Sequence, residues 1–287
     1  MTATDTPRTP TGAAMRPRSA WAGWSLAAPL TVFTVLFFVG PFVTVLQSSL
    51  AVGSAFGPGN FSRALGSPVF WRSVGNTLQT SLLAVVITAV VALPFAYGLA
   101  MKPRGRQLML SLLFAPLVIN GVVRIYGLQA TLNLINQTLL DLGVIGTALP
   151  LNYSMTGIVI GFVVFQFPLM AITVYSSLAR LDHTLVAAAH TLGANRFRTL
   201  VHVVLPSALP GLIGGSILVF ANSAGSYILP AMLGGGRVLT LPQLVYNSVT
   251  TDVDWSYGSA LALILVALVV PFLWAASTRQ RETGVSR

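Results

Sequence analysis

Long apolar runs, separated by short polar connections, set the hydrophobic pattern of this chain. One helical crossing of a bilayer requires roughly 20 apolar residues. The runs that are long enough are Trp24–Leu46, Thr77–Leu99, Leu108–Ala130, Met155–Leu178, Ala208–Tyr227 and Tyr257–Ala276. The pattern therefore predicts an all-α integral membrane protein with six transmembrane helices.

Composition favours the same class. Apolar residues make up 54% of the 287 residues and charged residues 8%, whereas a soluble domain carries about 25% charged residues. The net charge of +10 could suggest a nucleic-acid partner, but the basic residues stand in short clusters between the apolar runs. The chain contains no cysteine, which excludes disulfides and zinc-finger thiolates. We expect a membrane environment and no nucleic-acid partner.

The basic residues of the connections alternate between the two sides of the predicted membrane. The two tails and every second connection hold three Lys or Arg each, whereas the intervening connections hold two, none and one. Cytoplasmic segments carry the excess of positive charge, so both termini are predicted to be cytoplasmic, an N-in and C-in arrangement. We predict a disordered cytoplasmic tail at 1–20, a transmembrane domain at 21–280 and a second cytoplasmic tail at 281–287.

The cytoplasmic segment 179–207 has the pattern of two short helices joined at a glycine. Asp182 or Thr184 can cap a first helix. That helix is expected to end at Leu192, where Gly193 supplies a residue able to adopt the left-handed conformation.

The second helix of this segment can be capped by Asn195. Pro206 lacks an amide hydrogen and predicts a break before the fifth span. Such an amphipathic pair can insert into a groove of a partner protein or lie on the lipid surface. Both alternatives stay open on these grounds.

The same segment resembles the EAA loop of permease subunits of binding-protein-dependent ABC importers. The family pattern is Glu-Ala-Ala, three residues, Gly, and about nine residues further an aliphatic-x-Leu-Pro ending. The resemblance implies a type I ABC importer permease fold and a loop that docks on an ATPase, although Ala187 stands where the family has Glu. The coupling residues that it implies are Ala187, Ala188, Ala189, Gly193, Ala194, Phe197, Leu205 and Pro206.

Other stretches, such as Ile228–Gly236 and Leu239–Tyr246, are similar to spermidine/putrescine-type permeases. The resemblance implies a small polar solute, with a polyamine such as spermidine or putrescine as the first candidate. Aminoethylphosphonate, an opine and ferric iron are alternatives. It also implies an ATP-binding cassette ATPase dimer, a second and distinct permease subunit, and a periplasmic or lipid-anchored substrate-binding protein. The implied location is the bacterial cytoplasmic (inner) membrane, which the chain crosses several times.

The chain lacks the residues needed to hydrolyse ATP itself. A phosphate-binding loop requires Gly-x4-Gly-Lys-Ser/Thr, and the sole lysine is Lys102, which Pro103 follows. We therefore expect ATP and Mg on a partner subunit, no cofactor on this chain and no enzymatic activity. The histidines all lie within 179–207, and His183 and His190 are about 10 Å apart along a helix. We expect no metal site.

Polar side chains within the spans are costly in lipid, and they usually face a cavity or bond to a neighbouring helix. Arg124 lies near the outer end of the third span, where it could line a pathway or snorkel to the interface beside Tyr126. The candidates for a translocation pathway are Asn120, Arg124, Gln166, Asn222, Ser223 and Ser226. Each of the uncharged ones could instead bond across helices.

Two other functional classes compete with an importer permease. A self-contained secondary transporter or channel would need ionisable residues near the bilayer midplane, and the spans offer almost none. A membrane-bound enzyme would need a cluster of His or carboxylate residues, and none is recognisable. The leading hypothesis is half of an ATP-driven importer pore that works by alternating access.

Overall fold

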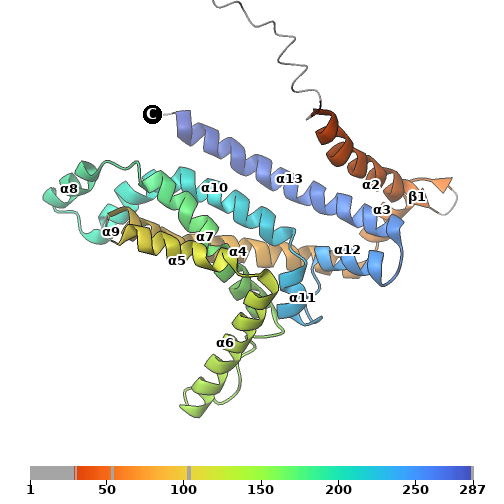
Figure 1. Ribbon diagram of the computed structural model, residues 1–287, viewed down its shortest axis with the longest axis horizontal. Coiled ribbons are helices and arrows are strands. Elements are labelled where there is room, and N and C mark those ends of the chain that lie inside the picture. Colours follow the sequence, from red (N-terminus) through yellow and green to blue (C-terminus); the bar gives the residue numbers. More distant parts are fainter. Residues whose placement is uncertain (1–28, 30, 53–54, 102–104, 286–287) are drawn as a thin grey trace, which may run out of the picture. The chain divides into compact units, whose positions relative to one another are not determined.

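The structure is a computed structural model that describes residues 29, 31–52, 55–101 and 105–285 (Figure 1). The predicted tail at 1–20 and Lys102 lie outside the described residues. The elements are η1 (Val35–Val39), α2 (Gly40–Leu50), β1 (Ala51–Val52), β2 (Ala55–Phe56), α3 (Gly59–Leu65), α4 (Pro68–Met101), α5 (Arg106–Val118), α6 (Gly121–Asp141), α7 (Met155–Leu178), α8 (His183–Thr191), α9 (Arg196–Thr199), η2 (Leu200–Val204), α10 (Leu205–Ala224), α11 (Ile228–Gly234), α12 (Leu241–Thr250) and α13 (Trp255–Val285).

Candidate membrane spans agree with the predicted helical class. Within the described residues, five continuous helices are long and apolar enough to cross a bilayer, and a bent pair makes a sixth if it is counted as one span. The fourth predicted span coincides with α7. The second is longer than predicted, because α4 begins at Pro68 rather than Thr77. The described residues divide into two units between residues 45 and 46, and the second unit holds everything described below.

Helices α4, α7 and α10 pack against one another and form the main core (Figure 1). The buried face of α4 carries small side chains three or four residues apart, which let the helices approach closely. They are Thr77, Ser81, Ala84, Thr88, Ala92 and Ala96. Between them, larger residues such as Val86 and Val90 are exposed. This division of α4 is what a helix needs when one face meets protein and another meets lipid.

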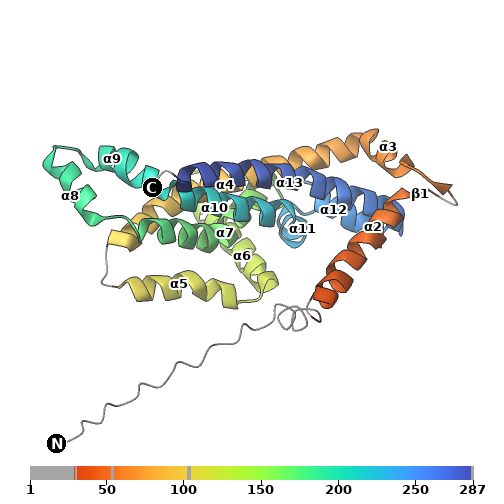
Figure 2. The same ribbon diagram turned by 90° about the horizontal axis from the view of Figure 1, so that it is seen from above.

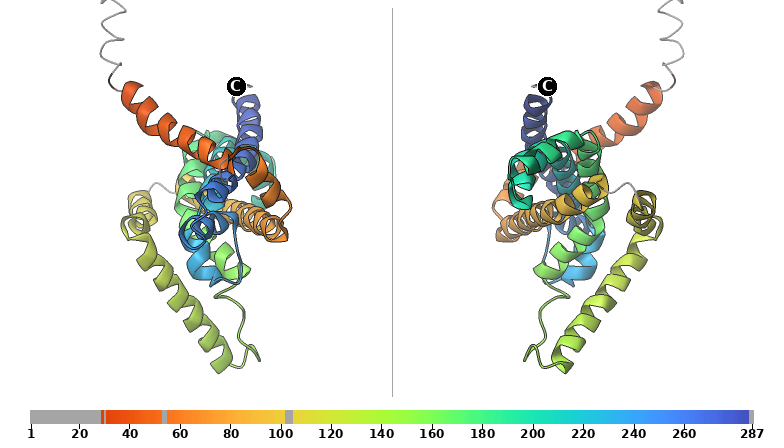
Figure 3. Two further views of the ribbon diagram at one scale, coloured as in Figure 1. Left: turned by 90° about the vertical axis from the view of Figure 1, so that its right-hand side faces the viewer. Right: turned by 90° about the vertical axis from the view of Figure 1, so that its left-hand side faces the viewer.

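The third predicted span, Leu108–Ala130, is not one helix. Helix α5 ends at Val118, Ile119 is extended, and α6 begins after Asn120 at an angle of 105° to α5 (Figure 3). The side chain of Asn120 accepts a hydrogen bond from the Val122 N–H at 2.9 Å and so caps α6. A single apolar run therefore contains a new helix start, which the hydrophobic pattern does not reveal.

The predicted break at Pro206 is also wrong. One helical stretch runs from Arg196 to Ala224, and its turn at Leu200–Val204 is π-helical, with the Leu205 N–H bonded to the Leu200 carbonyl. A π-helical turn shifts the hydrogen-bond register by one residue. Pro206 stands in the first turn of α10, directly after this π-helical turn. The stretch ends at Ala224, so Tyr227 lies beyond it.

The last span begins at a charged cap outside the apolar run. Asp254 accepts a hydrogen bond from the Tyr257 N–H at 3.0 Å, as an N-cap of α13 does. Asp254 also accepts a hydrogen bond from Nη1 of Arg63, on helix α3, at 2.7 Å. The Tyr257 amide and then Arg63 hold the pKa of Asp254 below its usual range.

Removing this cap has a predicted cost. We expect Asp254→Ala to lower the free energy of unfolding by about 1 kcal/mol, with little added by the exposed ion pair, which solvent screens. Because the folded-state pKa of Asp254 is lowered, its contribution is complete above the unfolded-state pKa, near 4, and is lost as pH falls through the folded value. Thermal unfolding in detergent between pH 6 and 3 measures this. Asp254→Asn keeps a capping oxygen but cannot ionise, so its stability should fall less with acid than that of the wild-type protein. Equal loss of stability in the wild-type protein and in Asp254→Asn would contradict the role of the Asp254 carboxylate as the cap of α13.

Candidate functional site

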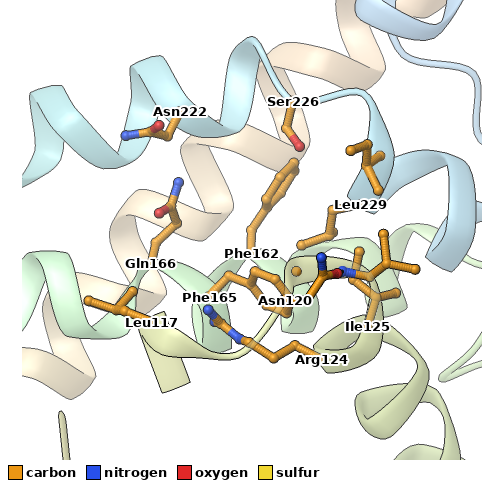
Figure 4. Close-up of a pocket in the computed structure, with 13 residues that line it drawn as sticks. Leu117, Asn120, Arg124, Ile125, Phe162, Phe165, Gln166, Asn222, Ser226 and Leu229 are labelled. Carbon is orange, nitrogen blue, oxygen red and sulfur yellow. The ribbon is translucent and has the colours of Figure 1, made fainter. Parts of the chain in front are cut away.

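A cavity of about 470 Å³ lies where the α5–α6 break faces α7 and the connection from α10 to α11 (Figure 4). Five of the six residues predicted for a pathway line it. Asn120 and Arg124 come from the break, Gln166 from α7, and Asn222 and Ser226 from α10 and the following connection. Asn120 and Ser226, which are 106 positions apart in the chain (226 − 120), are thus brought to one place.

Ser223, the sixth candidate, does not line the cavity. Its side chain is 2% exposed, and its hydroxyl has no hydrogen-bond partner among the described residues. Neighbouring residues on a helix point about 100° apart, so Asn222 faces the cavity while Ser223 turns into the core.

Arg124 is held in the cavity wall by two contacts. Its Nη1 donates to the Pro116 carbonyl at the end of α5 at 3.1 Å, and the guanidinium carbon lies 3.8 Å from the centre of the Phe165 ring (Figure 4). The Nη2 atom is buried and has no hydrogen-bond partner among the described residues. This position agrees with the pathway alternative for Arg124 rather than with snorkelling, and the pathway itself stays a prediction.

The apolar part of the lining could not be found from sequence. Phe162, Ile125 and Leu229 are almost fully buried and form one cluster, and Phe165 packs against it. In the sequence these residues resemble any others of an apolar run. Only the packing of α6, α7 and α11 separates the cavity wall from the lipid-facing side.

The two short helices predicted in 179–207 are present as α8 and α9, beyond the ends of α7 and α10 (Figure 2). The Asp182 carboxylate accepts a hydrogen bond from the Thr184 N–H at 2.9 Å. At the other end Gly193 has φ of +81°, and the Ala194 N–H bonds the Ala189 carbonyl at 3.0 Å. This is the Schellman arrangement that ends helices at a left-handed residue.

One face of α8 is apolar and exposed. Leu185, Ala188 and Leu192 share it by helical spacing, and Leu192 is 88% exposed. On the opposite side Val186 is buried in the main core. Phe197 on α9 adds another exposed apolar side chain, 72% exposed. We call these four residues, Leu185, Ala188, Leu192 and Phe197, the docking face.

The remaining implied coupling residues are distributed around the docking face. Ala187 is exposed, Ala189 and Ala194 are half-buried, and Leu205 and Pro206 belong to the start of α10. Their role in coupling stays a prediction.

Residues 92–278 match the family described as binding-protein-dependent transport system inner membrane component. The chain belongs to this family. The permease is 30% identical over 249 residues to the spermidine/putrescine transport system permease protein PotB of Escherichia coli (strain K12), with 84% of this chain and 90% of the relative covered. It is 32% identical over 225 residues to the molybdenum transport system permease protein ModB of the same strain, with 75% and 96% covered.

Solved structures show the same fold for this permease. A chain of a bacterial ABC transporter involved in the import of the acidic polysaccharide alginate superposes with a TM-score of 0.77 at 14% identity, covering 93% of the permease and 96% of that chain. A chain of the MetNI methionine ABC transporter gives a TM-score of 0.56 at 20% identity, covering 76% and 99%. The predicted all-α type I importer permease fold and the resemblance to polyamine-type permeases are confirmed. The permease is a multi-pass inner-membrane subunit of an ABC importer.

Proposed function

We propose that this permease forms half of the translocation pore of an importer for a small polar solute, driven through the docking face. The observation that supports this most directly is the placement of α8. It is fixed by Val186 to the core that contains α7 and α10, and it exposes an apolar face on its other side. A partner bound to that face would move α7 and α10 when it moves. Closure of the ATPase dimer on ATP binding would in this way switch the pore between its inward-open and outward-open forms.

The energy source is proposed to be a separate subunit. The sequence contains no phosphate-binding loop, and the curated relatives are named as permease proteins of transport systems. We infer an ATP-binding cassette ATPase dimer that carries ATP and Mg, a second permease of related but distinct sequence, and a periplasmic or lipid-anchored substrate-binding protein. No cofactor is assigned to this chain.

The relatives of this permease are named for solutes of different chemistry. One relative is named for spermidine and putrescine, another for molybdenum, so family membership does not fix the charge of the solute. A polyamine remains the proposal from sequence resemblance, with aminoethylphosphonate, an opine and ferric iron as alternatives. The charge of the side chains that line the cavity helps to choose between these solutes, as argued below.

Purification tests the subunit proposal. The tagged chain is isolated from its native membrane in mild detergent, and the chains that accompany it are identified by mass spectrometry. We expect an ATPase with a phosphate-binding loop and a second permease, together with ATP hydrolysis that chelation of Mg abolishes. Repeated isolation of an active transporter composed of this chain alone would instead favour a secondary transporter or channel.

A further inference from the structure

Among the residues that the structure describes, the lining of the cavity at the α5–α6 break contains a positive charge and no negative one, and Arg124 is its sole ionisable side chain. The six predicted spans contain no Asp or Glu at all. The acidic residues of the chain are Asp5, Asp141, Asp182, Asp252, Asp254 and Glu282. None of them belongs to the cavity lining.

Arg124 retains unused hydrogen-bonding capacity. A guanidinium has five N–H donors, and the hydrogen bond to the Pro116 carbonyl uses one of them. The Phe165 ring attracts the cation but does not neutralise it. A charge in such a site is costly unless it is paired, and the planar guanidinium suits an oxyanion, which it can bind through two parallel hydrogen bonds.

The amino terminus of α6 adds a partial positive charge to that of Arg124. This helix of 21 residues begins at the cavity, and Gly121 and Val122 of its first turn line it. A helix amino terminus carries a partial positive charge, and in transporters the ends of broken helices often face anionic groups of the solute. Gln166 and Asn222, from α7 and α10, place uncharged amide side chains in the lining (Figure 4). The Asn222 nitrogen donates to the Leu218 carbonyl at 2.9 Å.

We propose that this cavity binds an anionic group of the transported solute, a carboxylate or a phosphonate, with Arg124 as its counter-ion. The proposal rests on the proposed importer function and names the charge class of its solute. Putrescine and spermidine carry only positive charges and would be repelled by Arg124. Aminoethylphosphonate and opines carry both an amine and an anionic group, so they fit the charge and the amide groups of the cavity.

Because the chain contains no cysteine, a single introduced thiol can report the sign of the electrostatic potential in the cavity. Asn222→Cys places a thiol in the cavity, and Thr147→Cys places one in an exposed connection outside it. In the assembled importer, each thiol is reacted with negatively charged sulfonatoethyl and positively charged trimethylammonioethyl methanethiosulfonate. Mass analysis of this chain gives the rate at which each reagent modifies the thiol.

We expect the anionic reagent to be favoured at Asn222→Cys relative to Thr147→Cys. Adding Arg124→Gln should reduce that preference by about tenfold, whereas Arg124→Lys should keep it. Gln can still donate a hydrogen bond, so a role of Arg124 limited to holding the α5–α6 break would leave the preference unchanged in Arg124→Gln. That result would overturn the proposal.

Uptake into proteoliposomes provides the second arm, with labelled 2-aminoethylphosphonate, octopine, putrescine and spermidine as probes. We expect uptake of a probe with an anionic group and a loss of about tenfold or more in Arg124→Gln. Uptake of putrescine or spermidine that Arg124→Gln leaves unchanged would overturn the proposal. This outcome is distinct from a failure of the importer function itself, because ATP-dependent uptake would still be observed.

Discussion

Replacing Gly193 by valine is expected to abolish ATP-driven uptake while leaving membrane insertion and assembly intact. Gly193 has φ of +81°, a conformation that is strongly disfavoured for a β-branched residue. Beyond the two neighbouring residues, a Cβ at this position would meet no atom within 4 Å, so the cost comes from the local backbone conformation and not from packing. A penalty of about 2 kcal/mol on the left-handed residue lowers the ratio of the native to the non-native conformation at the end of α8 roughly 30-fold.

Two matched substitutions separate coupling from folding. Gly143 also has positive φ and open space around it, but it lies in the connection after α6, far along the chain from α8. Gly143→Val should keep uptake, and Gly193→Asn should keep most of it, because asparagine tolerates the left-handed conformation. The measurements are ATP-driven uptake into proteoliposomes and the amount of assembled complex. Normal uptake by Gly193→Val would count against the role of the docking face.

Adding a single methyl group at Gly211 is expected to destabilise the permease severely. A Cβ there would lie 2.5 Å from the Thr173 carbonyl oxygen and 2.8 Å from the Val174 Cα. Both are backbone atoms of α7, so no side-chain rotation relieves the overlap and the two helices must separate. We expect Gly211→Ala to cost about 3 kcal/mol or more of unfolding free energy, and to reduce the folded fraction in detergent.

Gly98 of α4 offers the matched control. A Cβ at Gly98 meets no atom within 4 Å, so Gly98→Ala should be neutral or stabilising by up to about 1 kcal/mol. Thermal unfolding followed by size-exclusion chromatography compares the two proteins. Equal stabilities would show that α7 and α10 are not packed as closely as the structure has them.

Sequence was informative where physical signals are local. The limits of α7 follow from the length of its apolar run, and the end of α8 follows from the capacity of Gly193 for positive φ. The start of α9 follows from Asn195, whose side chain accepts a hydrogen bond from the Arg198 N–H. The end of α8 and the start of α9 depend on residues within about one turn of each other, and α7 depends on one uninterrupted apolar run.

Sequence was misleading where a local signal competes with a longer pattern. The apolar run around Asn120 continues on both sides of it, so the pattern predicts a polar residue inside a span where the structure has the cap of α6. Pro206 is a strong signal for a helix break, but the helix continues through it after a π-helical turn. Neither outcome can be derived from the spacing of apolar residues.

The candidate site was predicted in its polar part only. Five polar residues were identified because such residues are unusual within spans, but their convergence depends on the α5–α6 break. Once Asn120 and Arg124 are placed opposite Gln166 and Asn222, the charge of the cavity becomes an observable property. On the proposal made above, this charge favours a solute that carries an anionic group over a polyamine.

A nucleotide-hydrolysing partner is proposed to sit on the docking face, and one cross-linking measurement tests this most directly. Ala188→Cys, in the exposed face of α8, carries a benzophenone maleimide in the active assembled importer and is irradiated. We predict a cross-linked product that contains this chain and an ATPase with a phosphate-binding loop, and no such product from Thr147→Cys. An importer that remains active while Ala188→Cys cross-links to the ATPase no more than Thr147→Cys does would contradict the account.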